Sequence, residues 1–287
     1  MIEEWMNYYS ESDIKKIQSV LLSLLDAFDS ICNSIHVSYY LYGGSLLGAI
    51  KYKGFVPWDD DLDVCLMRED YERLIKEGHK YLTKEYEIQH PLTNKLTPYP
   101  YVKFRKKNTA LVESTNAKIP INHGIYLDIY PIDNIPDSFV QYAKQKINYD
   151  KWVTLFRIRQ NSKFYYSDDS KKALLKRSVG FVARFLLKIL PSKWYMNKID
   201  SIATKYNDSS TARIGNLSYP FLTNYFFNYE GYDYVLFENR KVKILKGFEV
   251  NLKNRYGDIE ADPPNNKKIG HRPATLEISK IGGKNEN

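Results

Sequence analysis

The sequence predicts an α+β protein with a small mixed-sheet core and a helical C-terminal elaboration. Apolar residues recur every three or four positions in several long segments, which is typical of amphipathic helices. Short runs such as residues 125–130 alternate apolar and polar side chains, which is typical of strands. With 287 residues, 43% of them apolar, the chain can bury a core domain together with an elaboration.

The first elements alternate between helix and strand. A helix is predicted near 13–35, because one face repeats the apolar side chains Ile14, Ile17, Leu21, Leu24, Phe28, Ile31 and Ile35. The run VSYYLYGG then reads as a short strand ending at paired glycines, SLLGAIKY as a short helix, and LDVCLM as a second strand. REDYERLIKEGHKYL is predicted to be helical, and YVKFRKKNTALVES is predicted to contain one or two strands. GIYLDIYPID is predicted to be a strand closed by Pro131.

The sequence predicts three regions along the chain. These are a core over 1–136, a helical insertion over 137–229, and a strand-helix segment over 230–287 that packs back on the core. Helices are predicted near 137–160, 169–190 and 193–206, a strand in ENRKVKILKG, and a helix in FEVNLKNRYG that stops at Gly257. The tail after Asp262 is predicted to be irregular.

Composition restricts the environment and the partners. The net charge of +8 favours an anionic substrate, an anionic membrane surface or nucleic acid. Cys32 and Cys65 have no spacing that suggests a disulfide framework or a zinc site, so a reducing compartment is predicted. The start MIEEWMNYYSESD lacks the features of a secretory signal, and no apolar run reaches the roughly 20 residues of a membrane span. We therefore expect a cytoplasmic protein.

An aspartate cluster in WDDDLDV is the first chemical signal. In a strand, Leu62 and Val64 would face the core while Asp61 and Asp63 project together from the other face. At roughly 7 Å and an effective dielectric near 20, the repulsion of two carboxylates is about 2 to 3 kcal/mol, and a divalent cation would offset it. The alternative is an acidic turn whose charges are solvated. Neighbouring motifs favour the metal site.

Three further motifs supply a third carboxylate and groups for phosphate. Asp128 alternates with the apolar residues of its strand, where a lone acid needs a partner. Paired glycines before Ser45 would let helix-start amides approach a phosphate. The cations that could neutralise phosphate are Lys51, Lys53, Lys103 and Arg105. Each motif alone also fits an edge strand, a tight turn or a charged surface.

The run YLYGGSLLGAIKYKGFVPWDDDLDVCLMREDYERL resembles the LicD family, which includes the fukutin-related proteins. VKFRKKNTALV, GIYLDIYPIDNIP, FENRKVKIL and NRYGDIEADPPNNKKIGH extend the resemblance over roughly 14–136 and 230–272. It implies a polymerase-beta-like nucleotidyltransferase fold and transfer of a phospho-alcohol from a CDP-linked donor to a glycan. By matching position it implies Asp61, Asp63 and Asp128 as metal ligands and catalytic residues. Gly44 and Ser45 fall in the glycine signature, and Tyr52 departs from the family pattern, where His often stands.

The resulting expectation is a Mg²⁺-dependent transferase, with Mn²⁺ as an alternative ion, that moves phosphocholine from CDP-choline. The acceptor would be a cell-surface glycan such as lipopolysaccharide or teichoic acid, or its lipid-linked precursor, and region 137–229, which lies outside the resemblance, would select it. Donor phosphates would contact Gly44, Ser45, Lys51, Lys53, Lys103 and Arg105. The late family block adds His271 as a candidate substrate contact.

Two other functions stay open from sequence. A nucleotidyltransferase that attaches NMP to its acceptor would have the same metal site, and would release pyrophosphate instead of CMP. A non-catalytic nucleic-acid or glycan-binding module could use the +8 charge. The basic residues are spread along the chain without a recognised nucleic-acid motif, so no nucleic-acid partner is expected.

A basic amphipathic segment spans residues 174–190. In LLKRSVGFVARFLLKILP, polar positions recur about every four residues beside a broad apolar face. Such a helix could contact the inner face of the membrane peripherally. The alternative, which is the ordinary arrangement of an amphipathic helix and is favoured here, is that it packs its apolar face within the fold.

Overall fold

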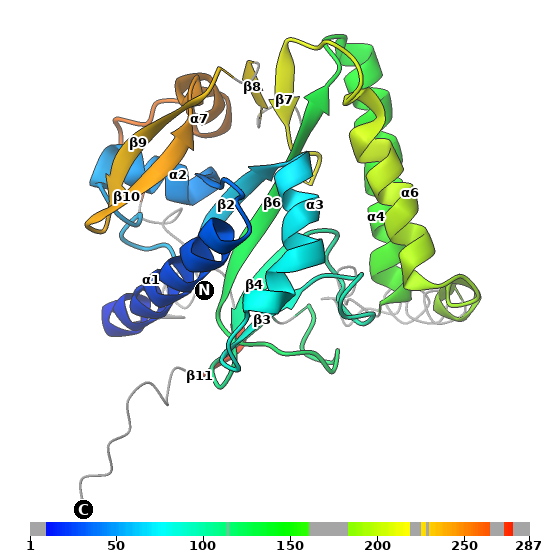
Figure 1. Ribbon diagram of the computed structural model, residues 1–287, viewed down its shortest axis with the longest axis horizontal. Coiled ribbons are helices and arrows are strands. Elements are labelled where there is room, and N and C mark those ends of the chain that lie inside the picture. Colours follow the sequence, from blue (N-terminus) through cyan, green and yellow to red (C-terminus); the bar gives the residue numbers. More distant parts are fainter. Residues whose placement is uncertain are drawn as a thin grey trace, which may run out of the picture.

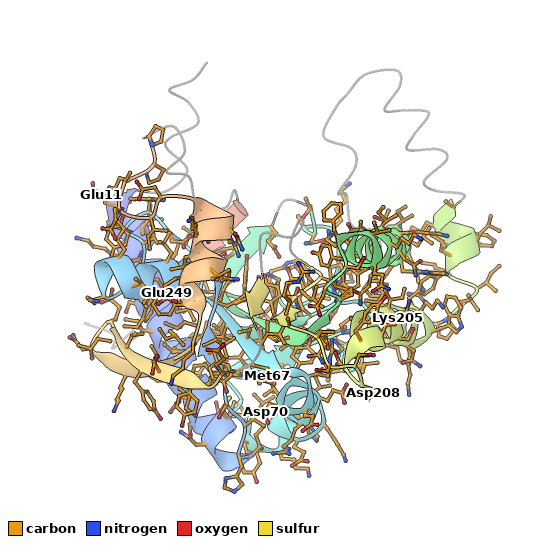
Figure 2. All side chains as sticks on the ribbon, turned by 90° about the horizontal axis from the view of Figure 1, so that it is seen from above. Glu11, Met67, Asp70, Lys205, Asp208 and Glu249 are labelled. Atoms are coloured by element: carbon orange, nitrogen blue, oxygen red, sulfur yellow. The ribbon has the colours of Figure 1, made fainter. Side chains whose placement is uncertain are left out.

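A computed structural model describes residues 10–113, 115–160, 183–218, 225–227, 230–264 and 273–277 of the chain. It confirms the α+β class: a mixed sheet forms the centre, helices pack against it, and a separate helix pair lies to one side (Figure 1). Viewed from above, the same helix pair lies beside the sheet, and Met67 and Asp70 mark the junction between the sheet and a covering helix (Figure 2).

The central sheet combines parallel and antiparallel strands. Its main path runs in the order β1 (Tyr40–Leu41), β2 (Asp63–Met67), β6 (Tyr126–Ile135), β4 (Val102–Lys106) and β3 (Tyr86–Gln89). β2 and β6 are parallel, whereas the β1 to β2, β6 to β4 and β4 to β3 pairs are antiparallel. β7 (Arg213–Gly215) pairs with the end of β6, and β8 (Tyr225–Phe227) pairs with β7. The two strands that carry the predicted carboxylates are therefore direct neighbours.

Helices α1 (Glu11–Ser34), α2 (Gly43–Tyr52) and α3 (Arg68–Glu77) surround this sheet, and a 3₁₀ turn, η2 (Gly78–Tyr81), follows α3. The predicted first helix is confirmed, and Ser10 caps it in a capping box with Asp13. Its apolar face is buried in one core cluster with the strand residues Val64, Val102 and Ile129. α1 thus provides much of the apolar surface that holds the sheet.

Helices α4 (Phe139–Arg159) and α6 (Ser192–Ala203) form the side pair, and η3 (Thr204–Tyr206) ends it. They share a second core cluster that includes Phe156, Tyr195 and Ile199. Arg68 of α3 links the pair to the sheet, since it contacts Asp133 on β6 and Asp200 on α6. Region 137–229 is mixed, not helical throughout, because β7 and β8 lie within it and extend the sheet.

The C-terminal part contains β9 (Tyr232–Phe237), β10 (Arg240–Leu245), α7 (Phe248–Tyr256) and β11 (Pro273–Glu277). β9 and β10 form a hairpin that lies over β1 and α2, as seen at the upper left of Figure 1. The predicted helix in FEVNLKNRYG is confirmed, and Gly257 follows its last residue at a φ of 72°. β11 pairs with β5 (Ala110–Glu113), so the prediction of an irregular tail is wrong in this part. A partner strand distant in sequence orders these residues.

The prediction that Pro131 closes its strand is also wrong. β6 continues to Ile135. Its pairing with β4 ends at Ile129 and its pairing with β7 starts at Asp133, so that side of β6 lacks ladder partners at Pro131. A residue without an N–H group is tolerated at such an interruption. β3, β7, β8 and β9 are strands that the sequence patterns did not predict.

The basic amphipathic segment is only partly covered. Residues 174–182 and His271 lie outside the described residues, and 183–187 form a helical turn. Among the helices that the structure describes, none combines the length and apolar character needed to cross a bilayer.

Buried His90 gives the fold a pH-dependent stability. Burial and the charge of Arg68 lower the pKa of His90 to about 3. The unfolded chain takes up this proton near pH 6.5, so stability falls as pH falls from 6.5 toward 3, by about 2 kcal/mol between pH 6.5 and 5. In His90→Asn, the amide oxygen can still accept the hydrogen bond from the Leu92 amide. Urea unfolding at both pH values should show that this variant lacks that part of the acid sensitivity, and equal slopes would contradict the assignment.

Candidate active site

Three adjacent strands bring a row of charged side chains to one face of the sheet. Asp63 on β2 lies in register with Asp128 on β6, and Asp128 lies in register with Lys103 on β4. Neighbouring strands are about 4.8 Å apart, so in-register side chains on one face are close neighbours. The row is therefore carboxylate, carboxylate, ammonium across the middle of the sheet.

A cavity of about 750 Å³ opens over this row. Asp61, Asp63, Asp128 and Lys103 all line it. Of the predicted phosphate contacts, Gly44 and Lys51 also line it, whereas Ser45, Lys53 and Arg105 do not. The structure thus gathers all three predicted metal ligands and half of the predicted phosphate contacts in one cavity.

The start of α2 supports the aspartates from one side. Gly43 adopts a φ of 57°, which glycine allows, and the Tyr42 amide hydrogen bonds to the Asp63 carbonyl. The Ser45 hydroxyl accepts a hydrogen bond of 2.8 Å from the Asp63 amide. Ser45 therefore holds the beginning of β2 in place beneath the cavity, which makes it a positioning residue.

Gly44 leaves room for Asp59. A Cβ atom at Gly44 would lie 2.6 Å from Asp59 Oδ2, so an alanine must displace that carboxylate. Alanine is the better helix former by about 1 kcal/mol, so Gly44→Ala should fold stably. We expect it to lower turnover about a hundredfold, because displacements near 1 Å in a reacting site have effects of that size. Turnover measured in an Asp59→Ala background tests the contact: Gly44→Ala should cost little there, and an undiminished loss would contradict it.

The carboxylates of the aspartate cluster lie close enough to affect one another's protonation. Asp59 shares a side-chain hydrogen bond with Asp61, and burial together with the charges of Asp61 and Asp63 raises the pKa of Asp59 well above its usual range. Carboxylate oxygens of this kind are the ligands that Mg²⁺ prefers. Within the described ranges no three Asp, Glu, His or Cys side chains lie close enough together to hold a metal ion as a group. The donor set thus fits a hard cation held by one or two carboxylates that completes its shell with substrate oxygens.

The Asp128 carboxylate is paired with a buried lysine. Lys103 Nζ lies 2.8 Å and 3.1 Å from the two carboxylate oxygens, and the Tyr130 hydroxyl donates to the same group. Burial raises the pKa of Asp128, and Lys103 partly offsets that rise. Lys103 is itself buried and sits 3.3 Å from the centre of the Tyr126 ring. The pair therefore forms a fixed polar wall of the cavity.

Arg105 and Lys53 are placed away from the cavity. Arg105 is fully buried and donates to Gln89, to the Gly124 carbonyl and to the Tyr99 hydroxyl. These contacts tie β4 to its neighbours, so its alternation with Lys103 reflects a structural role. Lys53 ends α2 in a left-handed conformation, and its ammonium donates to the Ile50 carbonyl. The placement supports neither residue as a contact of donor phosphates.

The segment after α7 forms the wall that sequence reasoning missed. Asp258, Ile259 and residues 261–264 line the cavity together with Arg255 and Tyr256 at the end of α7. Asp262 contacts Lys51 Nζ at 2.7 Å and accepts a 2.6 Å hydrogen bond from the Tyr52 hydroxyl. The late family block contains these residues, so a signal for them existed. Sequence patterns also did not assign four other lining residues to the site: Glu113, Tyr101, Tyr126 and Tyr130. Tyr126 and Tyr130 lie two positions before and after Asp128, so they share its face of the strand.

Two comparisons relate the sequence of this chain to known proteins. Residues 36–169 match the family model described as LicD/FKTN/FKRP, nucleotidyltransferase domain. The chain is 27% identical over 278 residues to the lipopolysaccharide cholinephosphotransferase LicD of Haemophilus influenzae, covering 90% of this chain and 95% of that protein. It is also 36% identical over 56 residues to an uncharacterized protein of Rickettsia prowazekii, covering 20% of this chain and 21% of that protein. The charged row lies inside the matched family segment, whereas α7 lies beyond it.

Proposed function

We propose that this chain is a phosphotransferase that moves phosphocholine onto a glycan hydroxyl. The first support is the match of residues 36–169 to the LicD/FKTN/FKRP nucleotidyltransferase domain. The similarity to a lipopolysaccharide cholinephosphotransferase over almost the whole chain supports this reaction and a lipopolysaccharide-type acceptor. The single observation that carries the proposal is the row of Asp63, Asp128 and Lys103 at the floor of a cavity. Phosphoryl transfer needs such positioned charge more than a covalent nucleophile.

The donor in this proposal is CDP-choline, bound together with Mg²⁺ or Mn²⁺. Asp61 and Asp63 would hold the ion, and Asp128 would be the third carboxylate facing it. When bound, the ion supplies positive charge to the diphosphate and to the leaving oxygen. Lys51 lines the same cavity from the end of α2 and can neutralise a phosphate oxygen.

Residues of this chain can take up the proton of the acceptor hydroxyl and orient the groups that react. The acceptor hydroxyl oxygen attacks the choline-bearing phosphorus, the bond from that phosphorus to the bridging oxygen breaks, and CMP leaves. Asp128 can accept the hydrogen bond, and then the proton, of the attacking hydroxyl. Lys103 holds the Asp128 carboxylate in one orientation through contacts to both of its oxygens. Gly44 at the start of α2 lines the cavity, where helix-start amides can contact a phosphate.

The lining of the cavity suits a quaternary ammonium group. Trp58, Tyr101, Tyr126, Tyr130 and Tyr256 contribute aromatic rings, and carboxylates lie among them. Aromatic faces attract cations such as choline, and each such contact contributes about 0.5 to 2 kcal/mol. This lining supports choline over neutral alcohols such as glycerol or ribitol.

The test is CMP release by purified protein with CDP-choline, CDP-glycerol or CDP-ribitol, in the presence of Mg²⁺ and lipopolysaccharide or teichoic acid as acceptor. We expect CMP and acceptor-bound choline with CDP-choline, and neither product with an Asp61→Asn, Asp63→Asn variant. Pyrophosphate release from nucleoside triphosphates, without CMP from any CDP-alcohol, would replace this function with nucleotidyl transfer.

A further inference from the structure

The helical turn at 183–187 exposes apolar side chains on its outward face. Leu187 points inward and packs on the core cluster of α4 and α6. Phe185 in this turn and Ile189 just after it are 73% and 75% exposed. The outermost face of this turn is therefore apolar, although an ordinary surface helix places polar residues there.

Other apolar side chains extend this exposed surface. Leu186 and Trp194 are 57% and 40% exposed, and Leu92 and Leu96 of the loop after β3 are 45% and 44% exposed. Contiguous exposed apolar surface rimmed by polar groups marks a protein interface or a membrane contact. The turn lies at the end of the α4 and α6 pair that is remote from the β9 and β10 hairpin (Figure 1).

Cations border the apolar side chains. A hollow of about 420 Å³ lies beside the turn, and its described lining includes the five basic residues Lys95, Arg159, Arg184, Lys188 and Lys193 but no acidic residue. From Ala183 to Ile199 the sequence contains Lys and Arg but neither Asp nor Glu. Whatever covers the apolar face must therefore bring negative charge to its edge.

We propose that this surface, formed by Arg184, Phe185, Lys188, Ile189, Lys193 and Trp194, docks the protein peripherally on an anionic lipid bilayer. Exposed Phe, Ile and Trp can enter the boundary between headgroups and acyl chains while the flanking cations contact lipid phosphates. A second copy of the chain fits less well, because a two-fold contact would place this basic surface against itself. The docking is independent of the reaction proposed above.

The experiment is sedimentation of the full chain with vesicles of 30% phosphatidylglycerol in phosphatidylcholine, or of phosphatidylcholine alone. We expect binding to the anionic vesicles that weakens with salt, and little binding to the neutral ones. Phe185→Ser, Ile189→Ser should lower the partition coefficient at least tenfold. Lys188→Gln, Lys193→Gln should lower it about thirtyfold, from roughly fivefold for each basic side chain near an anionic surface.

A matched control comes from α4, where Phe139 and Ile147 are 65% and 70% exposed. Phe139→Ser, Ile147→Ser should bind the anionic vesicles as well as the wild type does. Equal binding by all three variants, equal binding to both kinds of vesicle, or no binding by the wild type would overturn the proposal. A wild type that elutes as a dimer in size-exclusion chromatography while Phe185→Ser, Ile189→Ser elutes as a monomer would assign the surface to self-association instead. Because the readout is binding, its failure is distinct from a failure of the transferase assay.

Discussion

Asp63→Asn is expected to lower the turnover of CDP-choline about a thousandfold with little loss of stability. Asp63 is buried beneath the cavity, and both its amide and its carbonyl are hydrogen bonded, to Ser45 and Tyr42. Asparagine keeps the shape of the side chain but removes its charge. The stabilisation that a bound cation gives to developing charge is several kcal/mol, and about 4 kcal/mol corresponds to a thousandfold change in rate.

Thermal unfolding with and without Mg²⁺ gives this prediction a second readout. A ligand that binds only the folded state raises the melting temperature, so the wild type should show a Mg²⁺-dependent rise that Asp63→Asn lacks. Asp60→Asn is the matched control, since Asp60 is buried in the same aspartate run but does not line the cavity. If Asp60→Asn and Asp63→Asn lost activity equally, the effect would come from the acidic loop as a whole, and the assignment of Asp63 would fail.

Local patterns were sufficient to predict the faces of the strands that carry the site. Alternation placed Asp63 opposite Val64 and Asp128 opposite its apolar neighbours, and the structure has both carboxylates on the cavity side. What alternation could not supply was the parallel pairing of β2 with β6, which sets the two residues side by side. Register between strands separated by about sixty residues depends on the whole sheet, not on either segment.

The same limit explains Arg105 and the wall after α7. The alternation of Lys103 and Arg105 placed both on one face, but only the register shows that Lys103 meets Asp128 while Arg105 lies two pairs further, opposite Tyr126. The contact between Lys51 and Asp262 joins residues 211 positions apart. Neither periodicity nor spacing carries a signal for such a contact, so the family block could point to these residues but only the fold shows that they form a wall of the cavity.

Lys103→Met is expected to destabilise the protein by about 3 to 5 kcal/mol, the second large effect. Lys103 is 1% exposed and contacts both oxygens of the buried Asp128 carboxylate. Removing one partner of a buried ion pair leaves the other charge desolvated without compensation, which costs far more than the pair itself contributes. Urea unfolding in the presence of a chelator measures this loss on the protein alone.

Two comparisons distinguish a buried pair from a general effect of shortening a lysine on β4. Lys106 on the same strand pairs at 3.4 Å with Glu85, whose side chain is 67% exposed, so Lys106→Met should cost less than about 1 kcal/mol. Asp128→Asn added to Lys103→Met should recover part of the loss, because the uncompensated charge is then gone. Additive losses in this double variant would show that Lys103 and Asp128 are not energetically coupled. The row at the floor of the cavity would then be a set of neighbours in register without a functional pair.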